Sequence, residues 1–448
     1  MKIIITGAGD VGFHLAKLLS YESHDIYIID KSAEKLKYVE THLDVITIKG
    51  DATSLSLLKE YKINEADILL AVTESPEVNF TISILAKKLG AKKTIARISN
   101  PEFLKNDVIN FVELGIDSII SPEELAANEI KMLVQQSAFN DSIEFENGSL
   151  SILGGILSDT SPLINLTVQE AKSKFEEIDF ITIAIKSSGS KETIIPRGNT
   201  VFKANDQVYF STTADSHKKL HTLLGKEHHR INDVMILGGS RIGEKSARNL
   251  SQHNFNVKLI ESQKDRSFEL AEKYPKVLVV RGDGRNVDLL EEENIAEMDV
   301  FIAVTGNSET NIMSSLVAKS RGVKKTIALV ENMEYINISQ TIGIDTLINK
   351  KLLAASSIFK HIRKGKVLAL ANLHNIEAEI LEFEVNSDSL IANKKIKDLS
   401  ITSKAVFGGA IRNGKTYMTF GNFQLQANDK IIVFCLPEAI PELEKLFK

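Results

Sequence analysis

A short glycine-rich turn occurs twice in this chain, and each copy follows an apolar run and precedes a helical pattern. The first copy reads Gly7-Ala8-Gly9-Asp10-Val11-Gly12, and the second reads Gly238-Gly239-Ser240-Arg241-Ile242-Gly243. An acid, Asp30 or Glu261, stands 23 residues after the first glycine of each copy. A strand, a glycine turn, a helix and an acid after the second strand are typical of a doubly wound parallel sheet that binds a nucleotide.

The similarity between the two halves extends well beyond the turns. "ADILLAVTESPEVNFTISILAKKLGAKKTIAR" from Ala66 resembles "MDVFIAVTGNSETNIMSSLVAKSRGVKKTIAL" from Met298, and "GNTVFKANDQVYF" at Gly198 resembles "GNFQLQANDKIIVF" at Gly421. This pattern indicates an internal duplication. We divide the chain into four domains, N1 (residues 1–137), C1 (138–225), N2 (231–364) and C2 (365–448).

Apolar periodicity predicts the fold class of these domains. In N1, short β-rich runs alternate with helical patterns at Val11–Ser20, Ser32–Glu40, Ser54–Tyr61 and Asn79–Leu89. We therefore expect an α/β protein with two Rossmann-like parallel sheets, each followed by a small α+β domain with an antiparallel sheet. Helices predicted at residues 122–137 and 350–363 carry apolar side chains at helical spacing, so we expect them to join domains or subunits.

Composition limits the classes of function. The net charge of −5 disfavours a general electrostatic interaction with nucleic acid, and no nucleic-acid partner is expected. No stretch of about 20 apolar residues is present, and there is no signal-peptide pattern. The single cysteine, Cys435, lies in the apolar run "KIIVFCLP", where a buried structural thiol is expected. These features fit a cytoplasmic protein.

Each glycine of the first turn has a physical reason. Gly7 permits the tight turn, Gly9 lets the backbone approach a pyrophosphate, and Gly12 lets the helix pack closely on the sheet. The N–H groups at the start of that helix favour a phosphate. Asp30 is suited to accept hydrogen bonds from both ribose hydroxyls and to repel a 2′-phosphate, so NAD(H) is expected rather than NADP. Glu261 is suited to the same role in N2.

The second turn differs from the first at two positions. Ser240 replaces the middle glycine, where its hydroxyl either obstructs or contacts a phosphate, and Arg241 stands where the first turn has Asp10. We expect the Asp10 carboxylate to disfavour a triphosphate in N1, leaving NAD(H) or ADP, and Arg241 to favour ATP or ADP in N2. A decayed second copy that is retained only for its fold is the alternative.

The chain resembles the family of regulators of potassium conductance, the RCK domains. The resemblance rests on the doubled arrangement, "GAGDVG" with Asp30, "GDAT", "AVTESPEVN" and "KKTIARISNPEF", and it covers nearly the whole chain. It implies a cytoplasmic homo-oligomeric ring, of four subunits by family resemblance. The ring is expected to lie at the inner face of the cell membrane under a potassium-transporting integral membrane protein of the Trk type and to gate it as nucleotides exchange.

The resemblance also implies which residues contact the nucleotide. In N1 these are the turn from Gly7 to Val11, the ribose acid Asp30, Asp51 and Ala52 near the adenine, Thr73 and Glu74 at the end of the fourth strand, and Arg97 after the fifth. In N2 the matching positions are the turn from Gly238 to Gly243, Glu261, Asp283 and Thr305. Ser99 stands where the family often has a second arginine, and Leu329 replaces the arginine of N2.

No catalytic group accompanies these motifs, so we expect a binding protein and not an enzyme. The ten histidines show no metal-ligand spacing. A ligand then acts by its different affinity for two shapes of the protein. An NAD-dependent oxidoreductase and a soluble redox-sensing regulator are the alternatives, because the same sheet carries all three functions.

Overall fold

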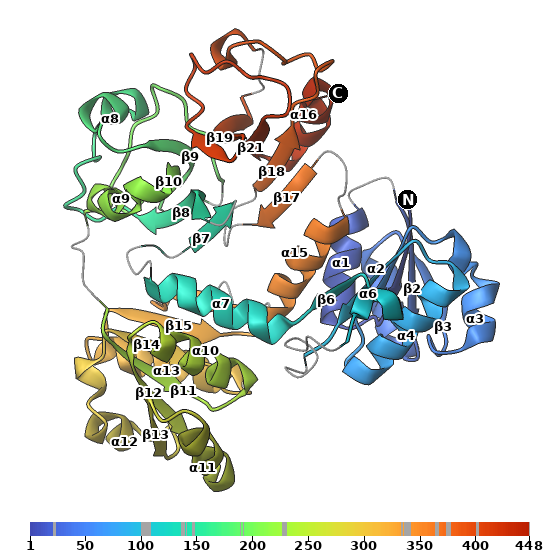
Figure 1. Cartoon of the computed structure of the whole chain (residues 1–448). Coiled ribbons are helices and arrows are strands. Elements are labelled where there is room, and N and C mark those ends of the chain that lie inside the picture. Colours follow the sequence, from blue (N-terminus) through green and yellow to red (C-terminus); the bar gives the residue numbers. More distant parts are fainter. Residues whose placement is uncertain are drawn as a thin grey trace. The chain divides into compact units, whose positions relative to one another are not determined.

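The computed structural model describes residues 1–20, 24–99, 109–135, 139, 141–145, 148–188, 190, 192–225, 231–332, 335, 342–362, 367–372, 378–399 and 403–447. The chain forms two compact units, one of Met1–Ile130 with Asp233–Ile362, and the other of Lys131–Asn232 with Arg363–Lys448. The first unit holds the two parallel sheets, and the second holds the two smaller sheets (Figure 1). The fold class predicted from the sequence is confirmed.

The N1 sheet has six parallel strands in the order β3-β2-β1-β4-β5-β6. The strands are β1 (Lys2–Thr6), β2 (Asp25–Asp30), β3 (Ile46–Lys49), β4 (Ile68–Ala71), β5 (Lys93–Arg97) and β6 (Ser118–Ile120). The helices are α1 (Asp10–Ser20), α2 (Ala33–His42), α3 (Leu55–Glu60), α4 (Pro76–Leu89), α6 (Phe111–Leu114) and α7 (Pro122–Gln135), with a 3₁₀ turn at Ile63–Glu65. The strand order reverses between β1 and β4, and ligands of such sheets bind at this point.

The N1 elements form where the sequence pattern predicts them. Every residue of β4 is buried, because a parallel strand is covered by helices on both faces. Helix α4 begins three residues before its predicted start at Asn79, since the Ser75 hydroxyl caps it and Pro76 fits the first turn. These two elements end and begin at the same edge of the sheet, where the first glycine turn lies.

The N2 sheet repeats the topology, in the order β13-β12-β11-β14-β15-β16. Its strands are β11 (Asp233–Leu237), β12 (Asn256–Glu261), β13 (Val277–Arg281), β14 (Val300–Ala303), β15 (Lys325–Leu329) and β16 (Thr346–Ile348). Its helices are α10 (Arg241–Gln252), α11 (Lys264–Lys273), α12 (Val287–Glu292), α13 (Ser308–Ser320) and α15 (Lys350–Ile362), with a 3₁₀ turn at Ile295–Glu297. The identical strand order follows from the sequence duplication.

The helix after the sixth strand of each sheet contacts the other repeat. Helix α15 of N2 packs against α1 of N1 (Figure 1). On α7 of N1, the Glu124 carboxylate accepts a hydrogen bond from Lys245 of α10 and lies 3.6 Å from the Arg248 guanidinium. The prediction that these two helices join domains is confirmed within one chain, and their contribution to joining subunits stays a prediction.

The C1 and C2 sheets are antiparallel, in the orders β7-β8-β10-β9 and β17-β18-β21-β19-β20. C1 contains β7 (Asp141–Phe145), β8 (Leu150–Ile156), α8 (Val168–Lys174), β9 (Phe180–Lys186), β10 (Gln207–Thr213), a 3₁₀ turn at Ala214–Ser216 and α9 (His217–Leu223). C2 contains β17 (Val367–Asn372), β18 (Glu379–Glu384), β19 (Ala405–Arg412), β20 (Lys415–Tyr417), β21 (Lys430–Cys435), α16 (Ile440–Phe447) and 3₁₀ turns at Ile396–Asp398 and Pro437–Ala439. One apolar core contains side chains from both sheets.

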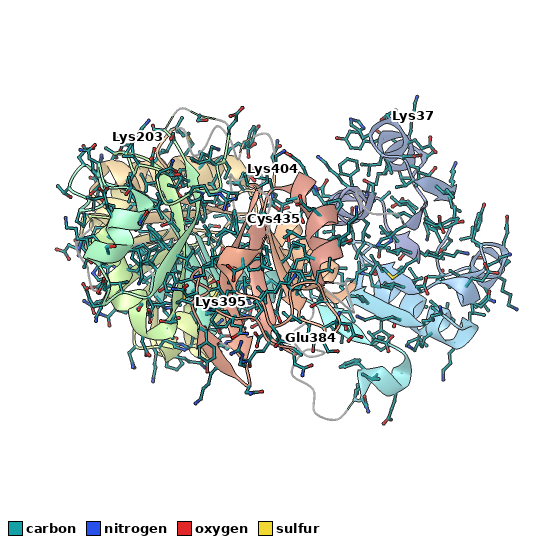
Figure 2. All side chains as sticks on the ribbon, turned by 90° about the horizontal axis from the view of Figure 1, so that it is seen from above. Lys37, Lys203, Glu384, Lys395, Lys404 and Cys435 are labelled. Atoms are coloured by element: carbon teal, nitrogen blue, oxygen red, sulfur yellow. The ribbon has the colours of Figure 1, made fainter. Side chains whose placement is uncertain are left out.

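Cys435 ends β21 and is fully buried (Figure 2), so the prediction of a buried thiol is confirmed. Among the helices that the structure describes, none combines the length and the apolar character needed to span a bilayer.

The two later glycines of the first turn differ in the space around them, and this generates a prediction. A Cβ on Gly12 would lie 1.9 Å from the Gly7 carbonyl oxygen, whereas a Cβ on Gly9 would have no atom within 4 Å. We expect Gly12→Ala to cost about 3 kcal/mol or more of unfolding free energy, because the obstacle is backbone. Gly9→Ala, its control at a helix cap, should cost about 1 kcal/mol or less. Chemical unfolding followed by circular dichroism measures both, and equal midpoints would contradict the close packing.

Candidate functional site

A pocket of about 510 Å³ lies at the carboxyl edge of the N1 sheet, at the first glycine turn. It is lined by Gly7, Gly9, Asp10, Val11, Ile29, Asp30, Lys31, Lys35, Gly50, Asp51, Ala52, Val72, Thr73, Glu74, Ser75, Val78, Ile82, Arg97, Glu331, Lys350 and Lys351. Most residues predicted for N1 line the pocket, whereas Ala8 and Gly12 contribute to the turn without lining it. Lys31, Lys35 and the three residues of N2 were not predicted.

The first turn is shaped by glycine at two positions and leaves space at the third. Gly7 has a φ of +105°, and a Cβ there would lie 3.0 Å from the Thr73 backbone. Gly12 is in still closer contact with the turn, as described above. Gly9 instead faces open space within the pocket. Since α1 begins at Asp10, this space adjoins unpaired N–H groups of a helix N-terminus, which is a favourable place for a phosphate.

Asp30 holds the turn in place from the end of β2. One carboxylate oxygen accepts a hydrogen bond from the Ala8 N–H at 2.6 Å, and the other accepts one from the Ser32 N–H at 2.7 Å. Each carboxylate oxygen has two acceptor positions, so both remain able to accept a ribose hydroxyl. Asp30 therefore connects the turn to the start of α2 and also lines the pocket.

Asp51 lies beyond β3, next to the buried Ala52. Hydrogen bonds from the Thr53 backbone and hydroxyl, and from Lys31 at 3.0 Å, lower the pKa of Asp51 to about 2. The carboxylate is thus charged at neutral pH and held on one side of the pocket. Lys31, its partner, lines the same pocket.

A buried asparagine, which sequence reasoning missed, fixes the next part of the site. The Asn79 side-chain oxygen accepts hydrogen bonds from the Thr73 N–H at 2.8 Å and the Thr73 hydroxyl at 2.6 Å. Its amide group donates to the Thr73 and Arg97 carbonyl oxygens. Asn79 therefore joins the ends of β4 and β5, which carry two predicted residues. The signal was present, because the matching position of N2 is also asparagine, Asn311.

Glu74 pairs with Lys35, whose Nζ lies 3.0 Å from the Glu74 carboxylate. The hydrogen bond to Glu74 raises the pKa of Lys35 above its usual value. Glu74 is largely exposed. Lys35 belongs to α2, which follows β2, and Glu74 follows β4. Strands β2 and β4 flank β1, so the two residues come from either side of the first turn.

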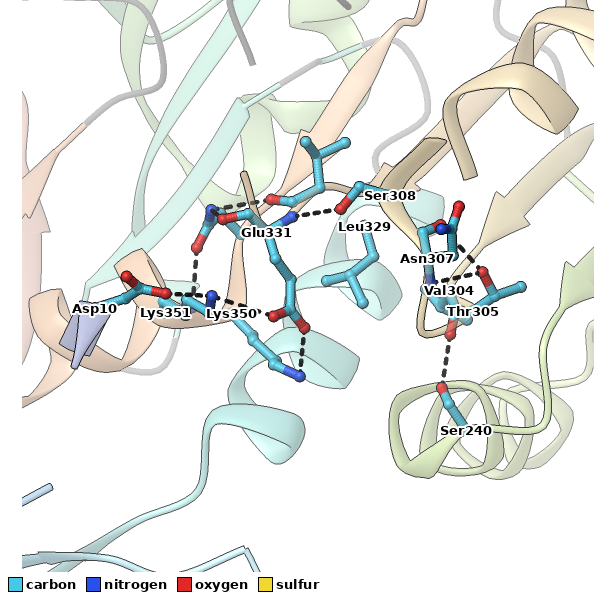
Figure 3. A network of polar contacts seen from close by, with 12 residues as sticks. Asp10, Ser240, Val304, Thr305, Asn307, Ser308, Leu329, Glu331, Lys350 and Lys351 are labelled. Carbon is cyan, nitrogen blue, oxygen red and sulfur yellow. Dashed lines mark hydrogen bonds and ion pairs between the residues drawn. The ribbon is translucent and has the colours of Figure 1, made fainter. Parts of the chain in front are cut away.

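Three charged residues of N2 complete the lining. The Lys351 ammonium pairs with Asp10 and lies 3.3 Å from the Glu331 carboxylate, and Lys350 lies 2.5 Å from the same carboxylate (Figure 3). Burial lowers the pKa of Lys351, but hydrogen bonds and charge from Asp10 and Glu331 outweigh burial, and the pKa lies above its usual value. Asp10 is therefore paired with a cation that was not predicted, and its effect on a triphosphate stays a prediction.

Helix α15 positions these two lysines through a buried cap. The Asn349 side-chain oxygen accepts hydrogen bonds from the Lys351 and Leu352 N–H groups at 3.0 and 3.1 Å. Its amide group donates to the Val330 carbonyl oxygen at 2.9 Å. The start of α15 is thus fixed to the end of β15, so Lys350 and Lys351 lie at a defined place beside N1.

The second turn satisfies its own polar groups. The Ser240 hydroxyl donates to the Val304 carbonyl oxygen at 2.7 Å and accepts from the Gly243 N–H at 3.2 Å, so it caps α10 (Figure 3). A hydrogen-bonded serine thus stands where the first turn leaves open space at Gly9. Ile242 and Gly243 lie in the first turn of α10, as Val11 and Gly12 lie in the first turn of α1. A Cβ on Gly243 would again lie 1.9 Å from the Gly238 carbonyl oxygen.

Glu261 reproduces the role of Asp30 with a longer side chain. It accepts hydrogen bonds from the Gly239 N–H at 2.8 Å and the Gln263 N–H at 2.7 Å. A Cβ on Gly239 would lie 2.7 Å from a Glu261 oxygen, whereas the shorter Asp30 leaves room for Ala8. A side chain at Gly239 would therefore need Glu261 and Leu270, whose Cδ1 lies 2.6 Å from the same position, to move.

A charged cluster covers the side of the second turn. The Arg266 Nε donates to the Gly239 carbonyl oxygen at 3.0 Å, and its guanidinium lies 2.5 Å from the Glu244 carboxylate. Burial raises the pKa of Glu244, but hydrogen bonds from Lys273, Tyr274 and Arg266 outweigh it and hold the pKa at about 2. Sequence reasoning did not identify this cluster. Arg241, the cation predicted for this site, is exposed at the start of α10.

The other predicted residues of N2 retain the local structure seen in N1. Thr305 donates its N–H and hydroxyl to the Asn311 side-chain oxygen, at 2.9 and 2.6 Å. The Asn311 amide donates to the carbonyl oxygen of the buried Leu329. Hydrogen bonds from the Arg285 side chain and N–H lower the pKa of Asp283 below its usual value. The second site therefore keeps the same framework around a differently filled turn.

Comparison with known proteins defines the class. The TrkA-N domain matches residues 3–122 and 234–350, and the TrkA-C domain matches residues 156–225 and 380–448. The fold is similar to the crystal structure of the GsuK RCK domain, with a TM-score of 0.61 and 16% identity over 100% of this chain and 94% of that chain. It is also similar to a structure titled "GsuK channel bound to NAD", with a TM-score of 0.60 and 15% identity over 100% of this chain and 78% of that chain. The chain thus carries two TrkA-N and two TrkA-C domains in tandem, with the fold of the GsuK RCK domain.

Two curated relatives give the family more narrowly. Trk system potassium uptake protein TrkA from Haemophilus influenzae is 32% identical over 455 residues, 100% of this chain and 99% of the relative. Trk system potassium uptake protein TrkA homolog 1 from Methanosarcina mazei is 31% identical over 456 residues, with both chains fully covered. The chain belongs to the Trk system potassium uptake protein TrkA family.

The Glu244 cluster generates a pH-dependent prediction. The pKa of Glu244 falls from its usual 4.5 to about 2 on folding, so its stabilisation is complete above pH 4.5 and is lost as the pH falls toward 2. Glu244→Gln should lower the unfolding free energy by about 2 kcal/mol at pH 7, and the difference from the natural chain should shrink between pH 4.5 and pH 2.5.

Chemical unfolding of both proteins at each pH measures this difference. Glu291→Gln is the control, because Glu291 forms an ion pair with Arg321 and is half exposed, and its effect should stay below about 1 kcal/mol. A Glu244→Gln difference that is the same at pH 3 and pH 7 would contradict the assigned charge.

Proposed function

We propose that this chain is a nucleotide-binding regulatory subunit that gates a potassium-transporting membrane protein of the Trk type. The observation that carries the proposal is the pocket at the first glycine turn, where open space at Gly9 adjoins a helix N-terminus and Asp30 lines the same cavity. A pyrophosphate at the helix N-terminus and a ribose at Asp30 use both features. NAD(H) or another adenine nucleotide is the ligand class that combines them.

The relatives support this assignment. The curated relatives carry the name of potassium uptake proteins. Structures of the GsuK channel with the same fold are described as bound to NAD and, at a TM-score of 0.50 over 81% of this chain, to ADP. Family membership and a matching pocket favour nucleotide-dependent regulation over the redox alternatives.

Binding without turnover is part of the proposal. The residues that line the pocket include no histidine, cysteine or tyrosine, and its lysines and acids are largely engaged with one another as ion pairs. In the part of the chain that the structure describes, no group of three or more histidine, cysteine or acidic side chains is placed to hold a metal ion. This arrangement suits a binding site and supplies no obvious acid–base pair for an oxidoreductase.

The second turn is assigned ATP or ADP. Glu261 stands at the ribose position, and the exposed Arg241 is available to a terminal phosphate. The Ser240 hydroxyl takes the Gly243 N–H that a phosphate would use, so binding here requires this hydroxyl to exchange its partner. We therefore expect weaker binding at the second turn than at the first.

Gating follows from differential binding. A nucleotide shifts an equilibrium between two shapes by the difference in its affinity for them, commonly about 1 to 3 kcal/mol for each site. Two sites in each chain of a homo-oligomer, proposed to be a tetramer, add their effects. The assembly is proposed to act at the inner face of the cell membrane. Within each chain, a ligand in the first pocket would lie against both α1 and α15, which pack against each other.

Ligand selectivity at Asp30 gives the first test. The natural chain should bind NADH at least about tenfold more tightly than NADPH, because the carboxylate repels a 2′-phosphate. Asp30→Asn should narrow this ratio to about threefold or less, whatever it does to the turn, since both ligands share the turn. Isothermal titration measures the ratio of the NADH and NADPH affinities. Glu261→Gln, the matching change at the second turn, is the control. Equal affinity of the natural chain for the two ligands would contradict the ribose assignment.

Potassium flux gives the second test. We expect the chain to co-purify with a Trk-type membrane protein and to change its potassium flux in proteoliposomes when a nucleotide is added. Gly9→Ala should reduce the nucleotide response at least about fivefold while the complex still forms, because the new methyl group lies in the pocket. A flux that is indifferent to this chain, or NADH oxidation by the chain alone, would overturn the proposed function.

A further inference from the structure

The first pocket is lined by residues from both repeats, and its charge pattern points to a specific role for the second. We propose that Lys351 of N2 is the residue that recognises the nucleotide phosphates in N1, and that a bound phosphate replaces Asp10 as its partner. This inference rests on the proposed function and adds the residue that couples the occupied pocket to the contact between α15 and α1.

The geometry places Lys351 at the phosphate end of the pocket. Asp10 is the first residue of α1 and follows Gly9, where the open space lies. Because Lys351 pairs with Asp10, its ammonium lies beside the N-terminus of α1. Its side chain is 24% exposed, and both Gly9 and Lys351 line the cavity. A phosphate at the helix N-terminus would therefore lie near this ammonium group.

The charge balance explains why a cation is needed there. A phosphate bound at α1 would meet the Asp10 carboxylate, and two anions in contact repel each other. Lys351 neutralises Asp10 in the structure. N1 supplies three basic residues to the lining. Lys31 pairs with Asp51, Lys35 pairs with Glu74, and Arg97 lies at the end of β5. Lys351 and its neighbour Lys350 thus bring positive charge to the turn from the other repeat.

The ammonium group can change partners without leaving its place. The Lys351 ammonium has three N–H donors. It lies 3.3 Å from the Glu331 carboxylate and also pairs with the Asp10 carboxylate. The terminal phosphate of ADP or ATP carries more negative charge than a carboxylate and competes for the donor that Asp10 uses. Glu331 stays in contact with Lys351, because Glu331 is itself fixed by an ion pair with Lys350 at 2.5 Å. Phosphate binding therefore exchanges the ion pair that joins α1 to α15.

The second turn lacks this arrangement. In the alignment of the repeats, Arg241 matches Asp10 and Glu123 matches Lys351, so both charges are reversed. The Glu123 Oε2 is buried and has no hydrogen-bond partner within the described part of the structure. Only the first of the two turns therefore has a cation from the opposite repeat placed to contact the phosphates.

Titration of the full chain with adenosine, ADP and ATP tests the inference. Lys351→Gln should weaken ADP and ATP by about tenfold and leave adenosine within about twofold, because only the phosphates contact the ammonium group. Lys351→Arg should retain most of the phosphate dependence. Asp10→Asn should strengthen ATP by about threefold or more, since it removes the competing carboxylate. Lys324→Gln, which removes an exposed lysine paired with Asp299, is the control for net charge and should change nothing.

The outcomes separate this inference from the proposed function. A natural chain that binds none of the three ligands, nor NADH, would overturn both. A natural chain that binds ATP as tightly as Lys351→Gln does would overturn only the role of Lys351. Where Lys351→Gln fails to fold, Asp10→Asn decides, because unchanged or weaker ATP binding by that variant overturns the exchange of partners.

Discussion

The missing Cβ at the third glycine of each turn is the constraint on which the rest of the structure depends. Both Gly12 and Gly243 would place a Cβ 1.9 Å from the carbonyl oxygen of the first glycine of the turn. Only glycine lets the helix start this close to the strand that precedes it. The close approach directs the helix N-terminus at the carboxyl edge of the sheet, and the acid at the end of the next strand then hydrogen-bonds to the turn.

The two repeats use this framework differently, and the difference begins with one side chain. Gly9 leaves space beside the helix N-terminus, whereas the Ser240 hydroxyl occupies the matching place and caps α10. The first turn is consequently open to a ligand, and its helix carries an acid that pairs with Lys351 from the other repeat. The second turn is stabilised by its own hydrogen bonds and by the Arg266–Glu244 pair. Duplication has thus given one chain two unlike sites.

Local patterns allowed the fold, the glycine turn and Asp30 to be predicted, because strand runs, glycine spacing and the acid after β2 are short-range signals. Asp51, Ala52, Thr73, Glu74 and Arg97 were predicted from the family resemblance. Asn79 was missed because a single asparagine predicts no particular contact, and the one signal was its repetition as Asn311 at the matching position of N2. Lys350, Lys351 and Glu331 were beyond prediction, because they lie more than 300 residues from the turn they face. The pairing of Asp10 with Lys351 was missed for the same reason.

A structure of the full chain determined with ATP or ADP is the most direct test of this account. We predict a nucleotide at the first turn, with its phosphates at the N-terminus of α1, its ribose at Asp30 and the Lys351 ammonium within hydrogen-bond distance of a phosphate oxygen. A first turn that stays empty while nucleotide is bound elsewhere, or an ion pair between Asp10 and Lys351 that persists beside an occupied turn, would contradict it.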